Sequence, residues 1–88
     1  MFITKQLTQK LSVGSGKDFS YFLLPETVSG YKVIGTQGYD LYGDFDVWVN
    51  VSSCMLNSNG KISFKGHNFG GGTAIPTAYI TVLYEKIN

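Results

Sequence analysis

The fold class of this chain is decided by one segment, Phe45-Asp46-Val47-Trp48-Val49-Asn50-Val51, whose side chains alternate more clearly than any others. A period of two is typical of a β-strand, because successive side chains of a strand point to opposite faces of the sheet. The segment therefore predicts a strand with two different faces. Its inward face holds Phe45, Val47, Val49 and Val51, and its outward face holds Asp46, Trp48 and Asn50.

The residues that follow predict a hairpin. The run Asn57-Ser58-Asn59-Gly60-Lys61 separates the first strand from a second β-prone run that contains Ile62 and Phe64. An Asn-Gly pair in this setting favours a tight turn in which both central residues have positive φ. We therefore expect the two runs to pair in an antiparallel arrangement.

The segment from Ile3 to Val13 fits two kinds of element. Its apolar residues recur at the four-residue spacing of a helix, but most of them also share one face of a strand. We favour the strand, because Thr4, Thr8 and Val13 suit a strand better than a helix. The run Gly14-Ser15-Gly16-Lys17 then predicts a turn.

Two further runs are apolar on both faces. Residues 18–24 end at Pro25, and residues 78–84 lie near the C-terminus. We expect the first run to be covered on both sides, and the second to lie in the middle of the fold or at a subunit contact. Another strand is predicted over Tyr31–Thr36, ending at Gln37-Gly38, and a flexible loop over residues 66–76.

The fold class that follows is all-β, a single small antiparallel β-sandwich of six to eight short strands, jelly-roll-like, spanning residues 1–88. Eleven glycines separate the short β-prone runs, and no long helix is available. Apolar residues make up 43% of the chain and aromatic residues 15%, which is enough for one compact core.

Charge and cysteine content argue against several kinds of protein. The formal net charge is +1, the lysines are scattered and arginine is absent, so we do not expect a nucleic-acid partner. A single cysteine, Cys54, leaves no internal disulfide. The sequence has neither a signal-peptide pattern nor an apolar run long enough for membrane insertion.

Three groups of residues were considered for chemistry, and none predicts a catalytic, metal or cofactor site. Cys54 and His67 lack a third group to complete a nucleophilic site or a zinc site. The carboxylates of Asp40, Asp44 and Asp46 do not have EF-hand spacing and sit too close together for a glycosidase pair. The run 70–72 is a glycine connector rather than a phosphate loop.

The outward face of the first segment suggests a ligand-binding surface instead. Exposed rings beside Asn and Asp can hold sugars, because a ring packs on the apolar C–H face while the polar groups bond hydroxyls. The candidate ligand-binding residues are Trp48, Asn50, Asp46, Tyr39 and Tyr42. The alternative is that Trp48 packs against a neighbouring sheet or subunit.

Two stretches carry a family resemblance. They are Ser29-Gly30-Tyr31-Lys32-Val33-Ile34-Gly35 and the ending Tyr79-Ile80-Thr81-Val82-Leu83-Tyr84-Glu85-Lys86. With them the chain resembles the small C-terminal head domains of tail-fibre and receptor-binding proteins of phages and prophages. The resemblance implies a β-sandwich head, often trimeric, that recognises saccharide or protein on a host envelope or caps a fibre. It supplies no site motif.

The function expected from these observations is that of a non-enzymatic receptor-binding head that recognises a cell-surface glycan or protein. Such a head would be a homo-oligomer, with a trimer favoured, and would be found in the virion tail or fibre after synthesis in the host cytoplasm. It is either a stand-alone component or part of a longer fibre protein. The alternatives are a purely structural virion protein and a carbohydrate-binding module of a secreted enzyme.

Overall fold

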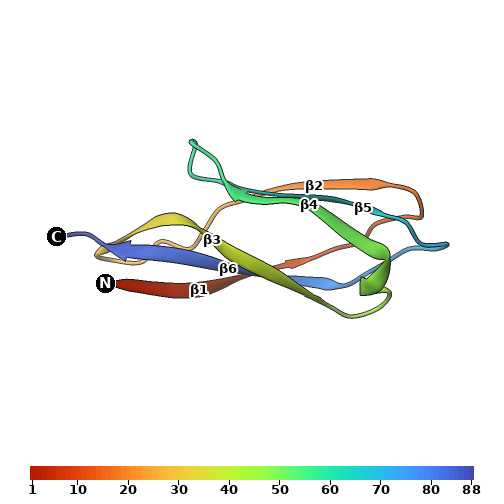
Figure 1. Cartoon of the computed structure of the whole chain (residues 1–88), viewed down its shortest axis with the longest axis horizontal. Coiled ribbons are helices and arrows are strands. Elements are labelled where there is room, and N and C mark those ends of the chain that lie inside the picture. The colour runs from red at the N-terminus through yellow and green to blue at the C-terminus, as the bar shows by residue number, and fades with distance from the viewer.

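The computed structural model describes all 88 residues as a sandwich of two antiparallel three-stranded sheets (Figure 1). The strands are β1 (Phe2–Lys10), β2 (Asp18–Leu23), β3 (Tyr31–Tyr42), β4 (Val49–Leu56), β5 (Ile62–Asn68) and β6 (Thr77–Lys86). A short 3-10 turn, η1 (Asp46–Trp48), precedes β4. One sheet has the order β1-β6-β3 and the other the order β2-β5-β4. The predicted all-β sandwich of at least six strands is confirmed.

The molecule is elongated, with extents of 50 × 22 × 15 Å. Every connection crosses from one sheet to the other, except the β4–β5 hairpin. The loops 11–17, 43–48 and 69–76 gather at one end of the sandwich, and both termini lie at the other end (Figure 1). We call the end that holds these three loops the apical end. No helix here is both long and apolar enough to cross a membrane.

The core lies between the two sheets and is built around the central strands β5 and β6. Its buried members are Leu11, Val13, Phe19, Ile62, Phe64, Ala78, Ile80, Val82 and Tyr84. Burying each large apolar side chain stabilises the fold by roughly 1.5–3 kcal/mol. The Tyr84 hydroxyl, which is also inside, donates a hydrogen bond to the carbonyl oxygen of Glu26 at 2.7 Å. The hydroxyl of this deeply buried ring therefore has the hydrogen-bond partner that a buried polar atom needs.

The two runs that are apolar on both faces take different positions in the sheets. Residues 78–84 lie in β6, the central strand of its sheet, so the expectation of a place in the middle of the fold is confirmed. The prediction that residues 18–24 are covered on both faces is wrong for a single copy of the chain. β2 is an edge strand. Phe22 on its outer face is 58% exposed, and Leu24, just after the strand ends, is 72% exposed. The two-sided pattern cannot distinguish burial inside one chain from an apolar surface left open.

The first segment is a strand, as favoured, because β1 pairs with β6 from Phe2 to Lys10 without a break. The turn before β2 is also confirmed, at Ser15-Gly16. By contrast, Gln37-Gly38 does not end β3. Gly38 adopts a φ of 98° and the pairing with β6 shifts by one residue between Thr36 and Tyr39, so this glycine forms a bulge and the strand continues to Tyr42.

The strand predicted over Phe45–Val51 begins only at Val49. Residues 46–48 form η1, Phe45 has a left-handed backbone, and the side chain of Val47 is 87% exposed. The reason is topological, because β3 ends at Tyr42 in one sheet and β4 starts in the other. The residues between them must cross the roughly 10 Å that separates packed sheets. An alternating pattern alone does not reveal that crossing.

The predicted hairpin between β4 and β5 is confirmed, although its turn differs in detail. The Gly60 N–H donates to the Asn57 carbonyl, and only Gly60 has positive φ, at 85°. The Asn59 side chain instead accepts a hydrogen bond from the Lys61 N–H at 3.0 Å. The loop is therefore a three-residue turn that ends in a glycine bulge, rather than a two-residue turn with two positive φ angles.

Candidate functional site

The apical end carries the most unusual backbone of the molecule, at Phe45. Its φ of 61° and ψ of 34° make it the one residue other than glycine with positive φ. A bulky side chain is rarely found in this region, where the conformation costs roughly 1–3 kcal/mol. The turn that holds it is closed by hydrogen bonds from Asp46 N–H to the Gly43 carbonyl and from Trp48 N–H to the Phe45 carbonyl.

The strained backbone places the Phe45 ring on the Trp48 ring. The two ring centroids lie 4.2 Å apart and the planes are within 10° of parallel. Phe45 is 53% exposed, whereas Trp48 is only partly exposed. The face of Phe45 that is turned away from Trp48 therefore gives the apical end a flat apolar surface open to solvent.

The other side of the Trp48 ring is occupied by Gly70. A Cβ atom at Gly70 would come well within 3.0 Å of the Trp48 ring, closer than real Cβ atoms approach a neighbour. The indole is thus packed between Phe45 and the backbone of the β5–β6 loop. Trp48 thus packs within its own chain, on Phe45 and the β5–β6 loop, and Phe45 is the more exposed ring of the pair.

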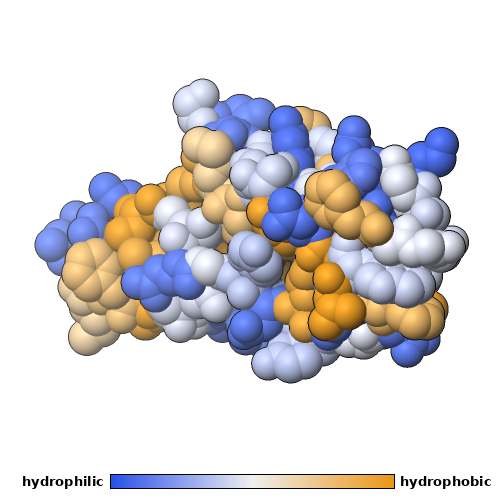
Figure 2. Space-filling model, turned by 45° about the vertical axis from the view of Figure 1, so that its right-hand side comes forward, coloured by the Kyte–Doolittle hydropathy of each residue, from blue (hydrophilic) through white to orange (hydrophobic).

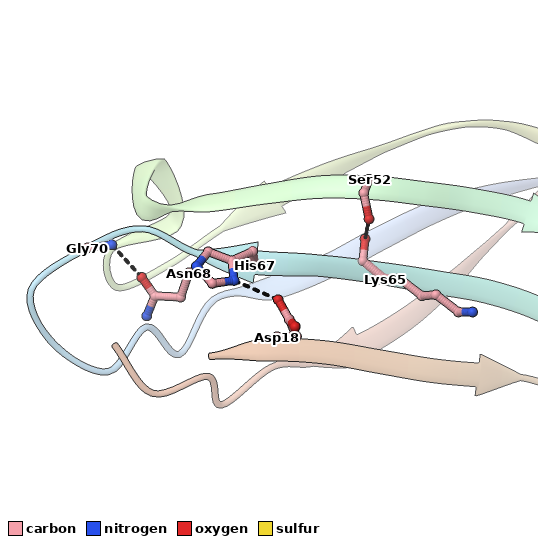
Figure 3. A network of polar contacts seen from close by, with 6 residues as sticks. All are labelled: Asp18, Ser52, Lys65, His67, Asn68 and Gly70. Carbon is pink, nitrogen blue, oxygen red and sulfur yellow. Dashed lines mark hydrogen bonds and ion pairs between the residues drawn. The ribbon is translucent and has the colours of Figure 1, made fainter. Parts of the chain in front are cut away.

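Asn68 fixes the loop that supports Trp48, and its side chain is fully buried. Its amide nitrogen donates to the carbonyl oxygens of Val13 at 2.8 Å and Gly72 at 2.9 Å. Its amide oxygen accepts from the Gly70 N–H at 2.7 Å (Figure 3). The Ser15 hydroxyl donates to the Gly70 carbonyl at 2.6 Å. The loop predicted over residues 66–76 begins only after Asn68, because residues 66–68 pair within β5. The glycine connector 70–72 does link β5 to β6, but hydrogen bonds on both sides hold Gly70 in place.

The remaining predicted ligand-binding residues are not brought together. Tyr39 lies edge-on to the core residue Phe64 of the other sheet at 5.7 Å, and Tyr42 lies edge-on to Tyr79 of its own sheet at the same distance. Asn50 is exposed on β4, where it pairs with His67. Asp46 alone stays next to the Phe45–Trp48 pair, in η1. Of the four predicted partners of Trp48, only Asp46 therefore remains near its ring.

Sequence reasoning missed the exposed apolar residues of the apical end. The alternating pattern predicts an inward Phe45, and the glycine-rich run predicts only a loop at Phe69 and Ile75, yet these side chains are 53%, 71% and 50% exposed. These residues come together because Ile75 N–H donates to the Asp44 carbonyl and Phe69 N–H donates to the Trp48 carbonyl. A usable signal was present in the sequence, since apolar residues directly beside Gly43 and the 70–72 glycines fall in loops. We call Phe45, Val47, Phe69 and Ile75 the apical apolar surface.

Cys54 and His67 lie on opposite faces of one sheet. Cys54 packs against the core beside Thr36, and burial raises the pKa of its thiol, with a smaller opposite effect from the Thr36 hydroxyl. His67 lies on the outer face, with Nδ1 2.6 Å from the Asp18 Oδ1 (Figure 3). Its ring centroid lies 4.4 Å from that of Phe69. The sheet therefore separates the thiol from the imidazole. No group of three or more potential metal ligands occurs in the structure.

The one hollow of the molecule lies away from the apical end, beside the loop that follows β2. It is lined by Leu24, Pro25, Glu26, Thr27, Val28, Tyr31, Val33, Gly60 and Tyr84. Its one charged side chain, Glu26, lies 3.8 Å from the Lys5 ammonium and is thereby partly neutralised. The hollow has no convergent polar groups of the kind that orient a small ligand.

A comparison of this chain with protein-family models, curated proteins and solved structures gives no match. The function therefore has to be inferred from the surface of this chain.

Proposed function

We propose that this chain is a non-enzymatic receptor-binding head of the phage tail-fibre type, which recognises a cell-surface glycan through the apical end. The observation that carries the proposal is the exposed Phe45 ring, held in a left-handed backbone conformation and stacked on Trp48. Backbone strain of this kind persists only where the surrounding structure enforces it, and it is concentrated at binding and active sites. Trp48 acts as the support that orients Phe45.

The chemistry of the apical end suits a sugar. The open face of Phe45 can pack against the apolar C–H face of a pyranose ring and remove both surfaces from water. Asp44 and Asp46 flank Phe45 in the chain and can accept hydrogen bonds from sugar hydroxyls. A flat ring between two carboxylates therefore offers both kinds of contact that a neutral saccharide needs.

The position of this surface supports the same function. The apical end lies opposite to both termini along the 50 Å axis (Figure 1). A surface at that end stays accessible whichever structure is joined to the termini. Exposed apolar patches on a small β domain commonly mark a contact with a partner. In Figure 2, apolar side chains reach the surface in several separate patches.

The test removes the ring without changing the backbone constraint. Phe45→Ala keeps a non-glycine residue at the left-handed position and deletes only the aromatic surface, and Phe2→Ala deletes an equally exposed ring at the opposite end. On an array of bacterial surface glycans, we expect Phe45→Ala to weaken binding at least about tenfold and Phe2→Ala to leave it unchanged. Absence of binding by the unmodified chain, or equal binding by both variants, would refute the proposal.

A structural virion component is the second candidate. It is favoured by the exposed Phe22 of β2 and the exposed Leu24 just after it, which a neighbouring subunit could cover. Such a protein would bind no glycan, so the same array separates the two functions.

A further inference from the structure

The open side of β2 carries unpaired backbone groups. β2 has β5 on one side and no strand on the other. The Asn68 N–H of β5 donates to the Lys17 carbonyl at 3.0 Å, just before β2 begins. Hydrogen-bonded positions recur at every second residue of an antiparallel pair, so Phe19, Tyr21 and Leu23 bond to β5. The N–H and C=O groups of the intervening residues of β2, Asp18, Ser20 and Phe22, therefore point out of the sheet.

The edge strand on the same side of the other sheet, β1, is protected against pairing. Lys5 of β1 lies opposite the buried Val82 and is therefore on the face of β1 that is turned toward the other sheet, where its ammonium lies 3.8 Å from Glu26. A charge that points inward on an edge strand is a common barrier to the addition of another strand, because the added strand would bury it. β1 is therefore a poor template.

The two remaining edges are protected in other ways. β3 is interrupted by two bulges and β4 by one, between Val51 and Ser53. Bulges twist an edge away from a regular pairing geometry. The two strands also lie against each other across the sandwich, where the Thr36 hydroxyl donates to the Cys54 carbonyl at 3.0 Å.

β2 has none of these barriers. Its pairing with β5 runs from Asp18 to Leu23 without a shift, and it contains neither lysine nor proline. Phe22 is exposed on its outer face, where the Lys65 ammonium lies 5.2 Å from the ring centroid. An even, apolar and open edge is a template for another strand. Of the four edges of the sandwich, only this one is prepared for pairing.

We propose that β2 pairs antiparallel with β2 of a second copy of this chain, about a two-fold axis at Tyr21. The two β2-β5-β4 sheets then join into one continuous sheet. A two-fold interface uses the same surface on both copies, so one open edge is sufficient. A cyclic trimer would instead need two different edges that fit each other, and the other edges carry barriers.

The residues of β2 select the register. With Tyr21 on the axis, Ser20 lies opposite Phe22 of the second copy, so their outward-pointing backbone groups meet, and Asp18 lies opposite Leu24, the residue that follows β2. A register centred on Phe22 would place Asp18 opposite Glu26 of the second copy, and like charges directly opposite each other are destabilising. A register centred on Ser20 would place Leu24 opposite Gly16, which has no side chain that could cover the exposed Leu24.

The pairing also covers apolar surface. In the Tyr21-centred register the two Phe22 rings lie diagonally across the axis, a separation of roughly 7–8 Å that aromatic side chains can span. The exposed Phe22 and Leu24 then lose contact with water on their open sides. Backbone hydrogen bonds and apolar burial thus act at the same strand.

The test uses two variants of β2 and one control. Ser20→Pro removes an N–H that makes no bond within one chain, and proline is tolerated at such edge positions. Phe22→Lys adds a charge to the same edge. Gln6→Lys adds the same charge to an exposed position of β1. Sedimentation velocity over a dilution series measures the mass, which for a dimer is twice the 9.7 kDa of the chain.

We expect the unmodified chain and Gln6→Lys to dimerise with similar affinity. Each β2 variant should raise the dimer Kd at least about tenfold, because two-fold symmetry applies the lost contact twice. In hydrogen exchange, the Ser20 and Phe22 amides should be protected in the dimer only. If Ser20→Pro does not fold, Phe22→Lys alone decides. A monomer at every concentration, a trimer, or a dimer that neither variant weakens overturns the proposal, and so does a monomer that pairs only with another protein.

Discussion

Replacement of Gly70 by alanine tests the packing that positions the apical end. The new Cβ would overlap the Trp48 ring well within 3.0 Å, so the ring or the loop must move by about 1 Å or more. The loop cannot yield easily, because Asn68 and Ser15 bond the N–H and the carbonyl of Gly70. Overpacking of this kind costs roughly 1–3 kcal/mol. In a domain of this size, about 2 kcal/mol lowers the Tm by about 8–16 °C.

Gly71→Ala is the matched control. It lies next in the same glycine run, has no positive φ, and would place its Cβ more than 4 Å from any neighbour. We expect its free energy of unfolding to stay within about 0.5 kcal/mol of the unmodified chain. Thermal unfolding followed by circular dichroism measures both variants.

The emission of Trp48, the only tryptophan, provides a second measurement. It should shift to longer wavelength in Gly70→Ala alone, because a displaced indole is more exposed to water. If the two alanine variants have the same Tm and the same emission, the inferred support of Trp48 by Gly70 is wrong.

Two further predictions concern the stability of the sandwich. Asn68→Ala leaves two carbonyl oxygens and one N–H without their partner, so we expect the free energy of unfolding in urea to fall by roughly 2–4 kcal/mol. The exposed Asn50→Ala should lower it by less than about 0.5 kcal/mol. Similar losses in the two variants would contradict the role of Asn68. Burial raises the pKa of the Cys54 thiol above its ordinary 9.0, and burial together with the Glu26 charge raises the pKa of the Tyr84 hydroxyl above 10.0. The unfolded chain therefore loses these protons at lower pH than the folded chain, and the free energy of unfolding should fall as the pH rises above about 9. The fall should be less steep in Tyr84→Phe. Equal slopes in the two proteins would show that Tyr84 makes no contribution to this pH dependence.

The sequence predicted the parts of the fold that depend on neighbouring residues. The turn at Asn57–Lys61 follows from glycine chemistry, and the alternating residues of 78–84 fit a strand with a buried face wherever that strand lies. The preference of threonine and valine for extended backbone was enough to separate a strand from a helix in β1. These features are local, so one chain segment contains the information for each.

The candidate site depended on contacts between distant residues, which the sequence does not reveal. Phe45 and Val47 fit an inward face by their period, yet they lie in the crossing between the sheets, where pairing has ended on one side and not begun on the other. Trp48 meets Gly70 only because the β3–β4 and β5–β6 loops converge at the apical end.

The same limit applies to β2. Its two apolar faces are visible in the sequence, but its place at an edge of the sheet depends on which strands pair, and pairing is decided by the whole chain. Short-range periodicity therefore determined the all-β class and most strands. Tertiary structure alone decided which apolar side chains are left at the surface, because that depends on how the sheets pack together.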